Sequence, residues 1–136
     1  MKRVLALDYG RKRTGIAVTD ELQLIASGLT TVSTFELLSF LKAYTKEEKV
    51  GTFIVGEPRQ MDNTPSEAEA FIAPFLLRLR KEFPDIPIVR QDERFTSKMA
   101  VQSMIVGGMK KKQRQNNALV DEISATIILQ AYLNTI

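Results

Sequence analysis

The sequence contains no cysteine and no histidine. These two absences exclude disulfides, thiol nucleophiles, zinc fingers, other Cys or His metal sites and catalytic triads built on histidine. Catalysis is then left to carboxylates, lysine, tyrosine and hydroxyl groups, with hard cations such as Mg²⁺ or Mn²⁺ as metals. The chain also lacks any apolar run near the ~20 residues of a membrane span, and the apolar part of its N-terminus is too short for a signal peptide. We therefore expect a soluble, cytoplasmic protein that does not enter a membrane.

The 136 residues are enough for one domain with its own core, and no linker or repeat divides residues 1–136. The net charge of +3 is unevenly distributed along the chain. Residues 1–19 carry +4, residues 20–77 carry −5, residues 78–114 carry +6 and residues 115–136 carry −2. Two basic blocks on either side of an acidic one favour a surface that faces a polyanion such as nucleic acid. The alternative is that these lysines and arginines only solvate exposed faces.

Short apolar segments bounded by turn residues predict five strands, at 4–7, 14–19, 24–32, 52–56 and 86–90. The short gaps between the first three strands favour an antiparallel meander. Gly28, inside the third strand, indicates a bulge or a close approach. The fourth strand shows no alternation of apolar and polar residues, which is consistent with burial on both faces.

Helical spacing of apolar residues predicts four helices after the meander. The first helix should begin at a capping box at 33–36, and the second at a capping box at 64–67 with Pro65 at its first helical position. The second helix should also be kinked at Pro74. The third should be capped by Thr96 or Ser97 and end at 107–108, and the last should run from Asn117 to about Asn134. The order β-β-β-α-β-α-β-α-α predicts an α/β fold. Its mixed five-stranded sheet has three antiparallel strands followed by parallel ones, with helices on both faces.

Three acidic residues stand at positions that suggest chemistry. Asp8 ends the first strand, Glu93 follows the fifth strand, and Asp121 lies in the first turns of an otherwise apolar helix. Each also has a structural explanation: Asp8 as a turn cap, Glu93 as the surface partner of Arg90 or Arg94, and Asp121 as a favourable charge near a helix N-terminus.

The three acids are more informative together than singly. We expect the first strand to be central and the fifth to pair on its parallel side, so that Asp8 and Glu93 project at the edge where open α/β sheets bind ligands. Asp121 shares a helix face with Ser124, Ala125 and Ile128, and the two small residues allow this face to approach the sheet. Converging carboxylates need a counter-charge, and two divalent cations about 3.5–4 Å apart could activate water for phosphodiester hydrolysis.

The sequence resembles the YqgF family, also called RuvX, along essentially its whole length. The matching segments are Leu7-Asp8-Tyr9-Gly10 with residues 13–18, Val55-Gly56-Glu57-Pro58 with Met61-Asp62, Asp92-Glu93-Arg94-Phe95-Thr96-Ser97, and Val120-Asp121 with residues 128–133. The family is described as pre-16S rRNA nucleases or Holliday junction resolvases with an RNase H-like fold. The resemblance implies that Asp8, Glu93 and Asp121 form the acidic catalytic triad and bind Mg²⁺ or Mn²⁺, as two ions. Asp8 would bridge the ions, and water would be the nucleophile.

Two positions depart from the family pattern, which usually has leucine at position 57 and glycine at position 63. Glu57 is therefore an additional carboxylate after the fourth strand. It is either a solvated loop acid, which we favour, or an accessory metal ligand. Asn63 still tolerates a left-handed turn, so the loop geometry can survive.

Basic residues accompany the three acids in the sequence. The candidate nucleic-acid-binding residues are Arg11, Lys12, Arg13, Arg94, Lys110, Lys111, Lys112 and Arg114. They could neutralise backbone phosphates, which predicts salt-sensitive and largely sequence-independent binding. The group at 110–114 could equally be a solvated loop. Thr96 and Ser97 are expected to cap a helix rather than act as nucleophiles, because no base is available to activate them.

Together these features predict a metal-dependent phosphodiester hydrolase acting on structured nucleic acid. The resemblance favours pre-16S rRNA as the substrate, with a ribosomal particle as a possible partner. Resolution of branched DNA at a Holliday junction is the alternative, and its two coordinated nicks would need a homodimer rather than a monomer. A non-catalytic nucleic-acid-binding module is a further alternative. A nucleotide-binding protein of actin-like architecture ranks last, because the chain is short for a two-domain cleft.

Overall fold

The computed structural model describes residues 2–58, 67–92 and 117–136. The described elements, in chain order, are β1 (Arg3–Tyr9), β2 (Arg13–Thr19), β3 (Ala26–Ser33), the short 3₁₀ helix η1 (Thr34–Glu36), α1 (Leu37–Glu47), β4 (Val50–Glu57), α2 (Glu69–Glu82), β5 (Ile88–Asp92) and α5 (Asn117–Leu133). The predicted helix after Thr96 and the predicted basic loop at 110–114 lie outside the described residues, as do Glu93 and Arg94.

The five strands form one mixed sheet in the order β3-β2-β1-β4-β5. β1 pairs antiparallel with β2 and β2 with β3, which confirms the predicted meander, whereas β4 runs parallel to both β1 and β5. The prediction that the fifth strand pairs directly with the first is wrong, although the side of β1 was predicted correctly. β5 lies on the parallel side of β1 but pairs with β4, because the buried fourth strand takes the place next to β1.

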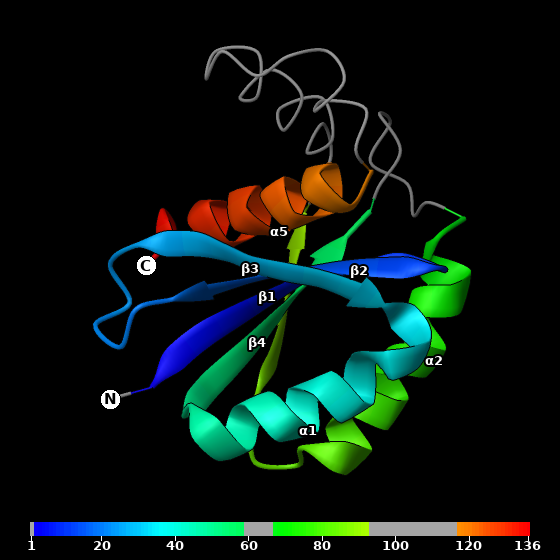
Figure 1. Cartoon of the computed structure of the whole chain (residues 1–136), viewed down its shortest axis with the longest axis horizontal. Coiled ribbons are helices and arrows are strands. Elements are labelled where there is room, and N and C mark those ends of the chain that lie inside the picture. The colour runs from blue at the N-terminus through cyan, green and yellow to red at the C-terminus, as the bar shows by residue number, and fades with distance from the viewer. Residues whose placement is uncertain (1, 59–66, 93–116) are drawn as a thin grey trace.

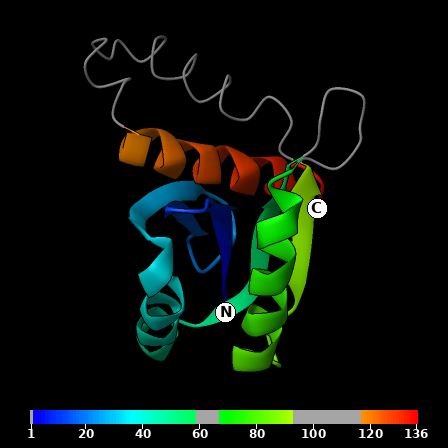
Figure 2. The same ribbon diagram turned by 90° about the vertical axis from the view of Figure 1, so that its right-hand side faces the viewer.

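Helices cover both faces of the sheet, as predicted (Figures 1 and 2). The alternation of β1 divides the core between them. Leu5 and Leu7 join a large apolar cluster with α1 and α2, whereas Val4 and Ala6 join a smaller cluster with Ala125, Ile128 and Leu129 of α5. α5 packs mainly on β2, β3 and β1. The helix therefore crosses the antiparallel half of the sheet, and its N-terminal turns reach the β1–β2 end.

The third strand begins two residues later than predicted. Leu24 and Ile25 lie in the β2–β3 turn, because the Asp20 carboxylate accepts hydrogen bonds of 2.8 Å from both of their backbone N–H groups. Gly28 shows both features expected of it. The register skips a residue beside it, which is a bulge, and the Glu122 side chain of α5 lies where a Cβ would stand.

The predicted capping box at 33–36 is wrong, and most of the one predicted at 64–67 lies outside the described residues. Ser33 is the last residue of β3 and its side chain makes no capping bond, so α1 begins only at Leu37. α2 begins at Glu69, with Ala68 before it, whereas Thr64, Pro65 and Ser66 lie outside the described residues. α2 does continue through Pro74 without a break, as expected. Within the described part of the chain, no helix combines the length and apolarity needed to cross a bilayer.

Candidate functional site

Asp8 lies near the carboxyl end of β1, on the face of the sheet that α5 covers. Strand alternation places it on the side of Val4 and Ala6, which pack against α5, and opposite to Leu5 and Leu7. Its partner in the antiparallel register is Gly15 of β2. Residues paired in this way present their side chains on the same face, so Asp8 and the bare face of Gly15 lie side by side.

The backbone of Asp121 occupies the space that a side chain at Gly15 would fill. A Cβ built on Gly15 would collide with the carbonyl group of Asp121 and with the Glu122 nitrogen. A hydrogen bond of 2.6 Å from the Thr31 hydroxyl to the Ala118 carbonyl holds the same end of α5 against β3. The first turns of α5 therefore rest on the strand next to Asp8, and this contact brings the two carboxylate-bearing segments to one edge of the sheet.

An ion pair joins the start of β2 to α5 at this edge. The Arg13 Nε donates to Oδ2 of Asp121 at 2.8 Å, with 43% of the arginine side chain and 24% of the aspartate side chain exposed. A pair this exposed is worth at most about 1 kcal/mol. Its importance is positional, because it holds a guanidinium and a carboxylate together beside the strand that carries Asp8.

The third predicted acid, Glu93, lies outside the described residues, although β5 ends one residue earlier at Asp92. β1, β4 and β5 are parallel and end at this same edge. Among the residues that the structure describes, no three acidic side chains gather closely enough to hold a metal ion. The two acids that are described have the chemistry that Mg²⁺ and Mn²⁺ prefer, namely carboxylate oxygen.

Glu57, the additional carboxylate, ends β4 at the same edge but on the other face of the sheet. Alternation places it with Phe53 and Val55, which face α1 and α2, rather than with Ile54, which faces α5. The pleat thus directs Glu57 away from Asp8. This favours the non-ligand role for Glu57.

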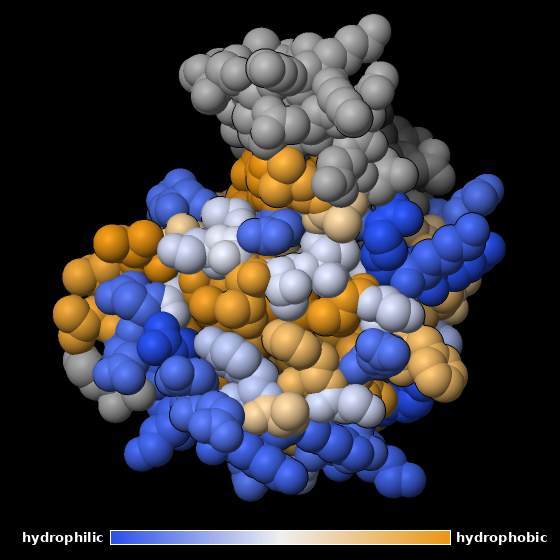
Figure 3. Space-filling view, in the orientation of Figure 1, coloured by the Kyte–Doolittle hydropathy of each residue, from blue (hydrophilic) through white to orange (hydrophobic). Residues whose placement is uncertain are grey.

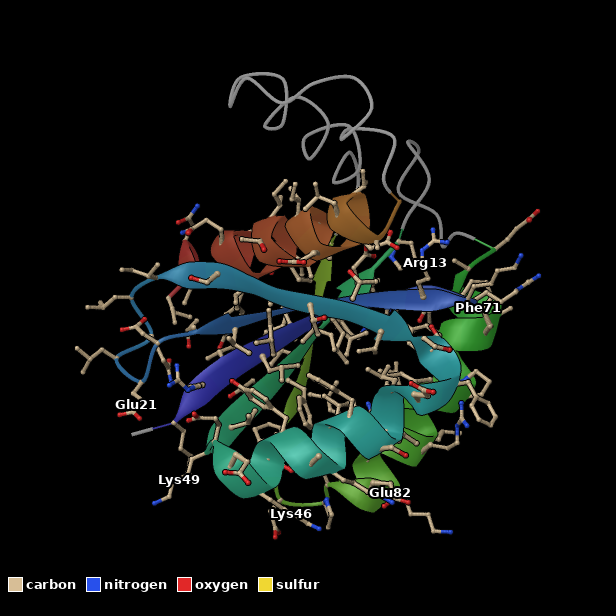
Figure 4. All side chains as sticks on the ribbon, in the orientation of Figure 1. Arg13, Glu21, Lys46, Lys49, Phe71 and Glu82 are labelled. Atoms are coloured by element: carbon tan, nitrogen blue, oxygen red, sulfur yellow. The ribbon has the colours of Figure 1, made fainter. Side chains whose placement is uncertain are left out.

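Basic side chains gather around the β1–β2 turn. Arg11, Lys12 and Arg13 are all exposed, and Figure 3 shows hydrophilic residues at the end of the sheet where Figure 4 labels Arg13. The opposite end carries the exposed apolar side chains of the β2–β3 turn, Leu22, Leu24 and Ile25. Positive charge is therefore concentrated at the edge that holds Asp8 and Asp121, where a polyanion would be attracted.

Three residues near this edge have contacts or an exposure that the sequence did not predict. Thr34 was interpreted as part of a capping box, but its hydroxyl donates to the Gly10 carbonyl at 2.7 Å and ties η1 to the β1–β2 turn. Phe35, which follows it, is 97% exposed. Arg90 makes a bidentate pair with Glu69 at 2.6 and 3.0 Å, whereas its predicted partner Glu93 lies outside the described residues. For Phe35 the sequence did offer a signal, namely a large aromatic residue at the expected start of a helix, where polar residues are usual.

The predicted face of α5 is confirmed, and it contains one unsatisfied hydroxyl. Ser124, Ala125 and Ile128 are buried against the sheet, and within the described residues the Ser124 Oγ has no hydrogen-bond partner. We expect Ser124→Ala to raise the free energy of unfolding by about 1 kcal/mol, because it removes a buried unpaired group and improves helix propensity. Urea unfolding measures this change.

Thr126 provides the control for this variant. Its hydroxyl donates to the Glu122 carbonyl at 2.9 Å, so Thr126→Ala removes a satisfied group and should not stabilise the protein. A loss of stability in Ser124→Ala would show that the Ser124 hydroxyl has a partner.

The fold matches that of a solved structure. The structure superposes on the solved structure titled "T. thermophilus RuvC in complex with Holliday junction substrate" with a TM-score of 0.58, covering 99% of this chain and 98% of that one. The identity is 17%, so this match shows the fold, which is the RNase H-like arrangement expected from the sequence.

Sequence comparison identifies the family. The model of the RuvX family, described as Holliday junction resolvase, matches residues 2–135, and the chain belongs to this family. A relative from Christiangramia forsetii is 66% identical over 98% of each chain. Another from Phocaeicola vulgatus is 61% identical over 99% of this chain and 97% of the relative. Both carry the name "Putative pre-16S rRNA nuclease". The resemblance seen in the sequence is thereby confirmed.

Proposed function

We propose that this protein is a divalent-metal-dependent endonuclease that cleaves pre-16S ribosomal RNA during maturation of its 5′ end. The observation that carries the proposal is the close packing of Asp121 on Gly15, the strand partner of Asp8. This packing joins two carboxylates from distant parts of the chain at one basic edge of the sheet. The names of the relatives support pre-16S rRNA as the substrate.

In this proposal Asp8, Glu93 and Asp121 would hold two Mg²⁺ or Mn²⁺ ions. When bound, such ions lower the pKa of a coordinated water and stabilise the leaving oxygen of a phosphodiester. The carboxylates supply the hard oxygen ligands. No histidine or cysteine is needed for this chemistry, in agreement with the composition.

We further propose that the basic residues orient the substrate. Arg11 and Lys12 contact backbone phosphates from the exposed β1–β2 turn, as do Arg94, Lys110, Lys111, Lys112 and Arg114. Arg13 has a second role, because it also neutralises Asp121. Its guanidinium has donors beyond the Nε atom that pairs with Asp121, so it can contact a phosphate while the ion pair persists.

Side-by-side cleavage of a 16S precursor RNA fragment and a four-way DNA junction tests the proposal. Each substrate is incubated with Mg²⁺, with Mn²⁺ and with EDTA, and the oligomeric state is measured in the same buffers. We expect metal-dependent cutting of the precursor RNA and none in EDTA. Cutting of the junction alone, by a dimer, would replace the RNA assignment with the resolvase one. Salt-dependent binding without cutting under any condition would favour a non-catalytic binding module.

A further inference from the structure

A cavity of about 310 Å³ lies beside the β1–β2 turn, on the face of the sheet opposite to α5. It is lined by Arg11, Thr34, Phe35, Leu38, Phe75 and Arg78. This volume is at the lower end of the range of small-ligand sites, about 300–1,000 Å³. Asp8 lies on the other face of the sheet, with Val4 and Ala6, which pack against α5. Figure 4 shows Phe71, over which Arg11 lies, at the same end of the sheet as Arg13.

Phe35 is an exposed aromatic ring on a fixed segment of backbone. The residue is 97% exposed, although phenylalanine is usually among the most buried residues. The preceding residue anchors it, because the Thr34 N–H donates to the Lys12 carbonyl at 3.0 Å and the Thr34 hydroxyl donates to the Gly10 carbonyl. The buried Thr14 hydroxyl lies 2.9 Å from the Thr34 hydroxyl and completes the attachment. The backbone that presents the ring is therefore ordered before any ligand arrives.

Two arginines supply positive charge to the same cavity. Arg11 lies 4.9 Å from the centre of the Phe71 ring, which supports it by a cation–π contact, and Arg78 comes from α2. Within the described residues neither arginine forms an ion pair, whereas Arg3, Arg13 and Arg90 each do. The cavity thus combines a solvent-facing ring with two cations whose charge no carboxylate neutralises there.

We propose that this cavity binds an unpaired nucleotide of the substrate strand, with the base stacked on Phe35 and the adjoining phosphate between Arg11 and Arg78. An aromatic platform beside positive charge is the arrangement by which proteins hold single-stranded nucleic acid. One strand can pass from Asp8 around the β1–β2 turn to the cavity. The inference rests on the proposed function for its ligand, and it assigns the protein a preference for substrates with an unpaired segment next to the cleaved bond.

Binding assays without cleavage test this proposal. Fluorescence anisotropy in EDTA compares a short single-stranded RNA of precursor sequence with a blunt duplex of the same sequence. We expect Phe35→Ala to weaken binding of the single strand about five- to a hundredfold, as the loss of one base–aromatic stack does, and to leave binding of the duplex unchanged. Arg78→Ala should lower the slope of log affinity against log salt by about 0.7, which corresponds to one phosphate contact.

Two residues of α2 provide matched controls. Leu77 and Arg80 are exposed on the same helix but do not line the cavity. Leu77→Ala and Arg80→Ala should therefore bind the single strand as the wild type does, apart from a small change in salt dependence for Arg80→Ala. Phe35→Leu, which keeps an apolar side chain but removes the flat ring, should behave like Phe35→Ala.

Three outcomes would overturn the inference. Unchanged single-strand affinity in Phe35→Ala would show that the ring is not a stacking platform, and equal losses for single strand and duplex would show that it does not select unpaired bases. Either result leaves the nuclease proposal standing, because metal-dependent cleavage is measured separately. A wild-type protein that binds neither RNA would contradict both proposals.

Discussion

We expect Asp8→Asn to lose at least about a thousandfold in the rate of RNA cleavage while keeping its fold and its affinity for nucleic acid. Asparagine has nearly the same shape as aspartate, so the packing between β1, Gly15 and α5 is preserved. The substitution removes the negative charge that would hold metal ions in the proposed site, and bound ions of this kind contribute several kcal/mol to stabilising a transition state. Single-turnover cleavage in Mg²⁺, together with binding in EDTA, separates the two effects.

Glu57→Gln is the matched control for this variant. Position 57 also carries a carboxylate at the end of a parallel strand, but alternation places it on the opposite face of the sheet. The Glu57→Gln variant should therefore cleave RNA and bind metal ions as the wild type does. Retained turnover in Asp8→Asn would refute the metal-ligand role of Asp8, and a large loss in Glu57→Gln would restore Glu57 as an accessory ligand.

The second large effect is expected from Gly15→Ala, which should lower the free energy of unfolding by about 3 kcal/mol, equivalent to about 10 °C in melting temperature. The added methyl group would overlap the Asp121 carbonyl, and a helix backbone cannot yield as a flexible side chain can. α5 must therefore move away from the sheet and take Asp121 with it. A shift of about 1 Å in a catalytic group can reduce activity about a hundredfold, so cleavage should fall even at temperatures where the variant is folded.

Gly28→Ala distinguishes this collision from a general effect of replacing a strand glycine. A Cβ at Gly28 would also meet α5, but it would meet the flexible side chain of Glu122, which can swing aside. We expect a stability change below about 1 kcal/mol and normal cleavage. Thermal unfolding and cleavage assays on both variants provide the comparison. If Gly15→Ala proved as stable and active as Gly28→Ala, the close contact between Asp121 and β2 would be contradicted.

Local patterns determined much of this fold because they act over a few residues. The short apolar segments indicated five strands, and the short gaps between the first three indicated a meander, which the register confirms. The spacing of Ser124, Ala125 and Ile128 predicted which face of the last helix is buried. The positions of Asp8 and Asp121 followed from the same patterns, because one lies near the end of a strand and the other near the start of a helix.

The errors occurred where a distant part of the chain competes with a local signal. The capping box at 33–36 fits the local rule, but Ser33 ends β3 without a capping bond, and the Thr34 hydroxyl beside it bonds to Gly10 and Thr14 in the β1–β2 region. The Arg90 guanidinium pairs with Glu69 of α2, which is 21 residues away in the sequence. Neither partner can be identified from spacing, because each contact forms only when the sheet and helices have packed.

The sequence by itself determined the kinds of elements, their order and the residue types available for chemistry. Alternation and helical periodicity are properties of the backbone, and they require only neighbouring residues. The tertiary structure decided which strand lies next to β1, how closely Asp121 approaches Gly15, which face of the sheet Glu57 occupies and that Phe35 stands exposed beside two arginines. These features depend on the packing of side chains from distant segments, and only the folded chain brings those segments together.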